Sequence, residues 1–177
     1  MKYYINEKRL KELLETLNEN KLEILHNRKV PESFLRNRPD FIINKKFIIE
    51  FDGYRHYNNS KNIIKDIETE KDWNELGYKI FRIPYFIQIR SDIKEIISKV
   101  LNIDISKIIE NDYKSGFWDE KALLPADFCE LGIQRFKKDL EIFKDYHYSE
   151  VIESLKYQVE KTGNIDLVLP KSLQHLL

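Results

Sequence analysis

The side chains best suited to chemistry in this sequence are three carboxylates, Asp40, Glu50 and Asp52, within the stretch RPDFIINKKFIIEFDGYRH. Two short runs rich in Ile and Phe surround the polar segment 44–46, and this pattern predicts paired strands joined by a tight turn. Carboxylates that crowd one site raise each other's pKa unless a cation lies between them. Oxygen ligands of this kind suit Mg²⁺ or Mn²⁺. We therefore expect Asp40 and Glu50 to hold a divalent metal ion, with Asp52 as a candidate third ligand.

The geometry of the predicted hairpin brings these acids together. With a three-residue turn, Ile43 pairs with Phe47, and Asp40 lies across from Glu50. Side chains alternate between the two faces of a strand, so Glu50 and Asp52 share one face with two isoleucines of the hairpin. The other face carries apolar side chains: Phe41, Ile43, Phe47, Ile49 and Phe51. Buried carboxylates need partners, so apolar residues on both faces favour a site. The alternative is solvated strand-end acids paired with nearby lysines.

A histidine follows the hairpin at short range. His56 lies four residues beyond Asp52, past a sharp turn expected at Gly53, so the chain can return the imidazole to the acids. There it would act as a general base or bind a phosphate. The alternative is a packed or surface histidine.

Basic residues flank the acidic hairpin. The connection 26–38 contains four basic residues and one acid, which suits either phosphate contact or a solvated loop. We predict contact with nucleic acid at Arg36 and Arg38, and also at Arg55 and Lys71.

The composition is that of a soluble globular protein. Of the 177 residues, 34% are charged and 42% hydrophobic, and 30 basic residues balance 30 acidic ones. The single cysteine, Cys129, excludes an intrachain disulfide and a zinc cluster of cysteines, and fits a reducing compartment. No apolar run approaches the roughly 20 residues of a membrane span. We therefore expect a cytoplasmic protein with no membrane partner.

The remaining elements follow from periodicity and end signals. Strand, helix and strand in that order imply a parallel pair within a mixed sheet. The expected helices cover residues 6–20, 60–77 and 92–101, and the expected strands cover 22–25 and 78–83.

The character of the chain changes near residue 102. Two helices are expected over 130–145 and 149–161, followed by an extended LVLP segment at 167–170. No catalytic signature is present there. We therefore expect a core domain over 1–101 and a mainly helical C-terminal extension of unknown role over 102–177.

Together, these motifs resemble the PD-(D/E)XK nuclease superfamily. Pro39-Asp40, nine intervening residues, and the segment EFDGYRH are similar to the branch of very short patch repair endonucleases, whose relatives carry E-x-D-G-x-x-H after the PD strand. Leu76-Gly77-Tyr78 resembles the helix end and the following strand of that branch. The resemblance spans about residues 7–82. It implies a restriction-endonuclease-like mixed α/β sheet flanked by helices, and a Mg²⁺-dependent endodeoxyribonuclease that binds DNA.

One position departs from the superfamily pattern. The motif ends in a lysine that helps to activate water, and Asp52 stands in its place. The resemblance assigns that role to His56, since the repair branch also lacks the lysine, or to a helix lysine such as Lys71, or else the role is lost. A single cysteine does not reproduce the structural zinc site of the repair enzymes themselves.

The expected activity is therefore DNA phosphodiester hydrolysis with Asp40, Glu50, Asp52 and His56 as catalytic residues. Double-strand cleavage by so small a chain implies a homodimer with two sites. Two alternatives stay open: a catalytically silent nucleic-acid-binding or interaction module on a nuclease fold, and a sequence-specific restriction or homing endonuclease.

Overall fold

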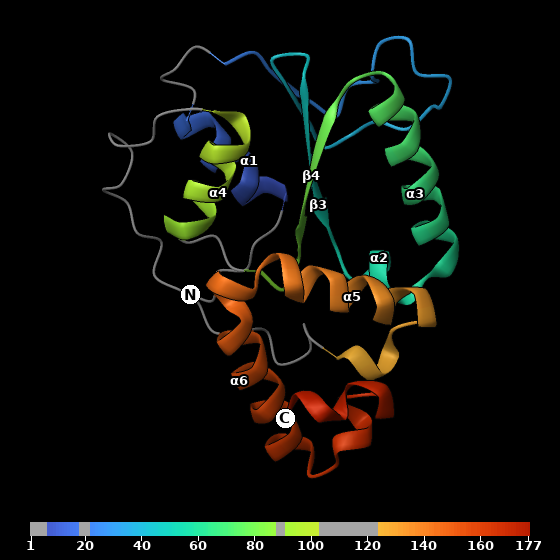
Figure 1. Cartoon of the computed structure of the whole chain (residues 1–177), viewed down its shortest axis with the longest axis vertical. Helices are drawn as coiled ribbons and strands as arrows, with labels where there is room; N and C mark the ends of the chain where they lie inside the picture. Colours follow the sequence, from blue (N-terminus) through green and yellow to red (C-terminus); the bar gives the residue numbers. More distant parts are fainter. Residues whose placement is uncertain (1–6, 18–21, 88–90, 103–123) are drawn as a thin grey trace.

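A four-stranded mixed sheet forms the centre of the molecule (Figure 1). The computed structural model describes residues 7–17, 22–87, 91–102 and 124–177. The strands lie in sequence order, with antiparallel pairing among the first three and parallel pairing between the last two. They are β1 (Ile24–His26), β2 (Phe41–Ile43), β3 (Phe47–Asp52) and β4 (Lys79–Pro84). The prediction of a parallel pair within a mixed sheet is confirmed.

Helices cover both faces of this sheet. Figure 1 shows α1 (Glu7–Leu17) and α4 (Ser91–Leu101) on one side and α3 (Ser60–Glu75) on the other. The short helix α2 (Arg55–Asn58) links β3 to α3. A mixed sheet flanked by helices was expected, and the specific restriction-endonuclease-like arrangement stays a prediction. None of the described helices is both long and apolar enough to span a membrane.

The β2–β3 hairpin has the register predicted from its sequence. Ile43 faces Phe47, and the turn between them holds Asn44 and Lys45 at positive φ of 51° and 52°. Its two faces bury different side chains, as expected. Phe41, Ile43, Phe47 and Ile49 join the large core with α1 and α4, whereas Ile42 and Ile48 pack with Trp73 of α3. The face of the acids is therefore the face that α3 covers.

Local signals at both ends fix the position of α3. The Asn59 side chain caps its start by accepting hydrogen bonds from the backbone N–H groups of Lys61 and Asn62. Gly77 follows the helix at φ +86°, a left-handed conformation that suits glycine, and the chain then enters β4. Both ends match the predicted helix.

The described C-terminal residues belong to the same hydrophobic core as the sheet. The predicted pair of helices is present as α5 (Glu130–Ile142) and α6 (Lys144–Thr162), and Phe136, Leu140 and Phe143 pack into the cluster that contains Phe41. Residues 103–123 lie outside the described ranges.

The prediction of an extended LVLP end was wrong. Two 3₁₀ helices, η3 (Ile165–Leu167) and η4 (Lys171–Leu176), frame that segment. The Asn164 side chain starts η3 by accepting a hydrogen bond from the backbone N–H of Asp166. The turn that follows buries Val168 and Leu169 completely, so burial of apolar side chains outweighs the local preference for an extended chain.

Candidate active site

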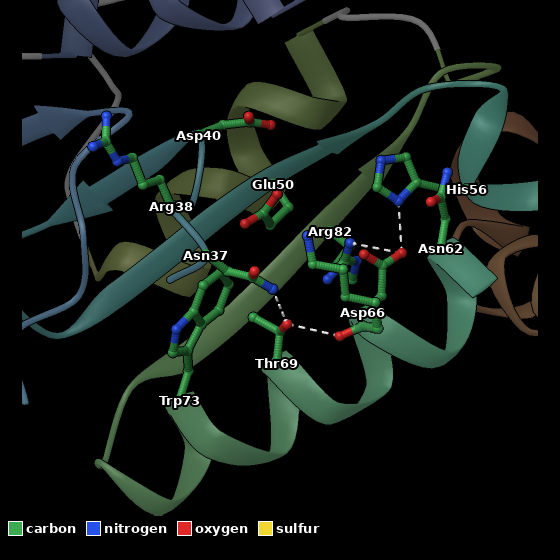
Figure 2. Close-up of a pocket in the computed structure, with 11 residues that line it drawn as sticks. Asn37, Arg38, Asp40, Glu50, His56, Asn62, Asp66, Thr69, Trp73 and Arg82 are labelled. Carbon is green, nitrogen blue, oxygen red and sulfur yellow. Dashed lines mark hydrogen bonds and ion pairs between the residues drawn. The ribbon is translucent and has the colours of Figure 1, made fainter. Parts of the chain in front are cut away.

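Asp40 and Glu50 line one open pocket of about 340 Å³ between the sheet and α3 (Figure 2). Asp40 immediately precedes β2, and Glu50 lies within β3. The hairpin register places these two positions opposite each other, as the sequence predicted. Two carboxylates separated by ten residues in the chain thus share one solvent-accessible cavity.

The Asp40 carboxylate is fixed through one of its oxygens. Its Oδ2 accepts a hydrogen bond of 2.7 Å from the backbone N–H of Phe51. Burial raises the pKa of Asp40 to about 6, although the Phe51 hydrogen bond opposes the shift, and the charges of Glu7 and Asp52 add to it. No hydrogen bond from the described residues reaches the second oxygen, Oδ1, which could therefore bind a ligand in the pocket.

The Glu50 carboxylate is half-buried and lacks partners that would stabilise its negative charge. Among the described residues, no hydrogen bond and no ion pair reaches it. Burial raises the pKa of Glu50 to about 9, and the charge of Asp40 adds to the shift more than Arg82 opposes it. A buried acid in this condition either keeps its proton or binds a cation.

Asp52 has a different environment from the other two acids. Its carboxylate is almost fully buried and accepts hydrogen bonds from Nε and Nη2 of Arg82, at 2.8 and 2.6 Å. Arg135 of α5 donates a further hydrogen bond to Asp52 Oδ2. The predicted third ligand therefore lies outside the pocket lining, and guanidinium groups already occupy both of its oxygens.

His56 is held by a carboxylate that the sequence analysis did not select. Its Nδ1 donates to Oδ2 of Asp66 on α3 at 2.6 Å, and its second ring nitrogen lies on the side of the ring away from Asp66 (Figure 2). Burial alone would raise the pKa of Asp66, but the His56 hydrogen bond and the nearby Arg82 and Arg135 lower it to about 2. Asp66 is therefore ionised and accepts this hydrogen bond, which places a hydrogen on Nδ1 of His56 and fixes the orientation of the ring.

Asp52, His56 and Asp66 also offer ligand atoms within 4.8 Å of one another, a spacing at which a metal ion could bind. Arg82 and Arg135 already neutralise both carboxylates of this group, and a metal ion would have to displace those ion pairs. The Asp40–Glu50 pair has no such competitor among the described residues. It is the better candidate metal site.

Only one of the predicted nucleic-acid contacts lines the pocket. Arg38 does so, whereas Arg36, Arg55 and Lys71 are exposed elsewhere, and Lys71 pairs with Glu75 at 3.9 Å. Lys65 of α3 lines the pocket instead. Six positions along a helix leave two side chains about 120° apart around its axis, so Lys65 and Lys71 point in different directions.

The spacing of polar residues in α3 could have indicated which residues of this helix line the pocket. Asn62, Asp66, Thr69 and Trp73 follow one another at spacings of three or four residues, which places them on one face of α3. A polar stripe beside the acidic hairpin predicts a second wall of a site. No comparable signal marks Arg135.

The fold and pocket define a mixed α/β protein with a carboxylate pair opposite a histidine held by an aspartate. No family model, curated protein or solved structure matches the chain.

Proposed function

We propose that the chain is a metal-dependent endonuclease that hydrolyses DNA phosphodiester bonds. The observation that carries this proposal is the Asp40–Glu50 pair, which lines one pocket with raised pKa values and leaves Glu50 without a partner among the described residues. Such a pair suits Mg²⁺ or Mn²⁺, hard cations that bind carboxylate oxygens. The pattern PD…E-x-D-G-x-x-H supports the same reading.

Each side chain of the pocket has a role in this reaction. Asp40, through its second carboxylate oxygen, and Glu50 would hold the metal ion, which would supply Lewis-acid chemistry to the scissile phosphate and to a bound water. His56, oriented by Asp66, accepts the proton of the attacking water at Nε2. Arg38 and Lys65 place positive charge at the pocket and bind the phosphate backbone.

Lys65 supplies the ammonium group that the superfamily pattern places two residues after its glutamate. Asp52 stands at that position and is engaged by Arg82 and Arg135. Lys65 reaches the same pocket from α3, so the charge enters from the helix rather than from the strand.

Plasmid cleavage tests the proposal. Wild type should nick or cut supercoiled DNA with Mg²⁺ or Mn²⁺, and Asp40→Asn and Glu50→Gln should each lose at least about 100-fold in rate, since each removes a metal ligand. Glu68→Gln, an exposed change on α3, serves as the matched control. Wild-type rates in both pocket variants would overturn the proposal.

A catalytically silent nucleic-acid-binding module is the second candidate, and the engagement of Asp52 by two arginines at the lysine position favours it. Titration with Mn²⁺ separates the two. A metal-dependent nuclease gains thermal stability with Mn²⁺, and this gain is lost in Asp40→Asn, whereas a silent module shows no such gain. If cleavage occurs, the mapped ends distinguish a nickase from a sequence-specific restriction or homing endonuclease, and sedimentation reports whether a homodimer forms.

A further inference from the structure

Arg135 of α5 joins two carboxylates that lie next to the candidate active site. Its Nη1 donates to Asp66 Oδ2 at 2.7 Å, and its Nη2 donates to Asp52 Oδ2. The same Asp66 oxygen accepts the hydrogen bond from His56 Nδ1. One guanidinium thus contacts the group that orients the imidazole.

The docking of α5 on α2 determines where this guanidinium lies. The backbone N–H of Cys129 donates to the carbonyl oxygen of Tyr57 at 3.1 Å, and Gly132 lies so close that an added Cβ would be 1.7 Å from that oxygen. Arg135 follows one turn later and lies 5.5 Å from the centre of the Tyr57 ring. Asp139, one further turn along, accepts a hydrogen bond from the Tyr57 hydroxyl at 2.7 Å. These contacts fix α5 along its length.

Asp52, Asp66, Arg82 and Arg135 form a cluster of charged side chains, and its charges balance only when Arg135 is present. The side chains of Asp52 and Asp66 are 1% and 17% exposed, and those of Arg82 and Arg135 are 14% and 13% exposed. These two carboxylates and two guanidinium groups carry no net charge together. Without Arg135 one negative charge is uncompensated, and the nearest group able to balance it is the imidazole itself. A protonated His56 cannot accept a proton from water.

We propose that Arg135 is a positioning residue that holds Asp66, and through it His56, in the geometry and charge state that the pocket requires. This inference rests on the proposed nuclease function and assigns a role to the C-terminal part of the chain. The region 1–101 then lacks one component of the active centre, which α5 supplies. Among the described residues, eight charged side chains line the pocket that His56 shares or contact its ring or Asp66: Arg38, Asp40, Glu50, Asp52, Lys65, Asp66, Arg82 and Arg135.

The test compares full-length Arg135→Gln and Arg135→Lys with Lys137→Gln, an exposed change on the same helix. Arg135→Gln should lower kcat for plasmid cleavage by about 10- to 100-fold with KM unchanged, because His56 would contribute general base catalysis and no residue of α5 lines the pocket. The acidic limb of the pH–rate profile should move up by about one unit. Arg135→Lys keeps the positive charge but reaches only one carboxylate. Its cleavage rate should therefore fall several-fold, while the acidic limb of its pH–rate profile stays where it is in wild type. Lys137→Gln should behave as wild type.

Two outcomes would overturn the inference. One is a wild-type rate and pH profile for folded Arg135→Gln, which leaves the nuclease proposal intact. If Arg135→Gln fails to fold, the other outcome that would overturn the inference is a wild-type rate for Arg135→Lys. If wild type itself does not cleave DNA, the proposed function fails, and NMR titration of the His56 ring, assigned with His56→Gln, still decides on the network. The titration midpoint should rise by about one unit in Arg135→Gln, and an unmoved midpoint would remove the positioning role.

Discussion

The protonation of Glu50 contributes to the stability of the metal-free protein. Its pKa is about 9 in the folded protein and near 4.5 in the unfolded chain. Between these values the folded state retains a proton that the unfolded state has released. This contribution to stability is therefore complete below about pH 4.5 and is lost as the pH rises towards 9. Because a glutamine at position 50 cannot ionise, Glu50→Gln removes this loss.

We predict that Glu50→Gln raises the Tm of the metal-free protein at pH 8 by about 4 °C, or roughly 1–2 kcal/mol for a domain of this size. At pH 4.5 the two proteins should melt together. Differential scanning calorimetry in the presence of a chelator measures both values, with Glu68→Gln as the control. A lower Tm for Glu50→Gln at both pH values would contradict the raised pKa. Glu50→Gln should thus lower the cleavage rate while it raises the stability of the metal-free protein.

One face of helix α3 lines the pocket, and two lysines of this helix differ in whether they lie on that face. Lys65 lines the pocket, whereas Lys71 is exposed and paired with Glu75. We predict that Lys65→Met slows DNA cleavage by about 10- to 100-fold, since it removes a positive charge beside the phosphate, and that Lys71→Met stays within about two-fold of wild type. Single-turnover rates measure both variants. Equal losses in the two would indicate a general electrostatic effect of the helix rather than a specific contact.

Elements with local signals could be predicted from the sequence. Turn length and strand alternation fix the pairing of Ile43 with Phe47, and with it the opposition of Asp40 and Glu50. The Asn59 cap and Gly77 fix the ends of α3. Local signals did not reveal that Asp52 would be engaged by guanidinium groups, because a strand position gives the face of a side chain but not its partners. Lys71 was selected rather than Lys65 for a similar reason: the sequence shows both helix lysines but not the rotation of α3 against the sheet.

At the scale of the whole molecule, the site depends on contacts between distant parts of the chain. Asp52 and Arg135 are 83 residues apart, and nothing near residue 135 in the sequence indicates an active-site contact. The contact exists because α5 packs against α2 and shares the core of the sheet. Long-range packing of this kind follows from the shapes of several elements together, so periodicity and capping signals do not specify it. The predicted extension over 102–177 therefore includes Arg135, which contacts Asp52 and Asp66 beside the candidate site.

The closest approach between α5 and α2 provides a test of this dependence. A Cβ at position 132 would meet the carbonyl oxygen and carbon of Tyr57 at 1.7 and 2.6 Å, and both are backbone atoms that no side-chain rotation can move. We predict that Gly132→Ala forces α5 away from α2, lowers the free energy of unfolding by about 2–3 kcal/mol, and separates Arg135 from Asp66. Cleavage should then fall even at temperatures where the variant remains folded.

Gly53→Ala is the matched control, because an added Cβ there meets nothing within 4 Å. Thermal melts and single-turnover cleavage, measured together well below the Tm of each variant, separate loss of fold from loss of geometry. If Gly132→Ala kept both the stability and the rate of wild type, α5 would have room to move without consequence. The packing of the C-terminal helices would then be independent of the chemistry on the sheet. A loss of cleavage rate larger than the fraction of unfolded protein explains would instead show that the position of α5 sets the geometry around His56.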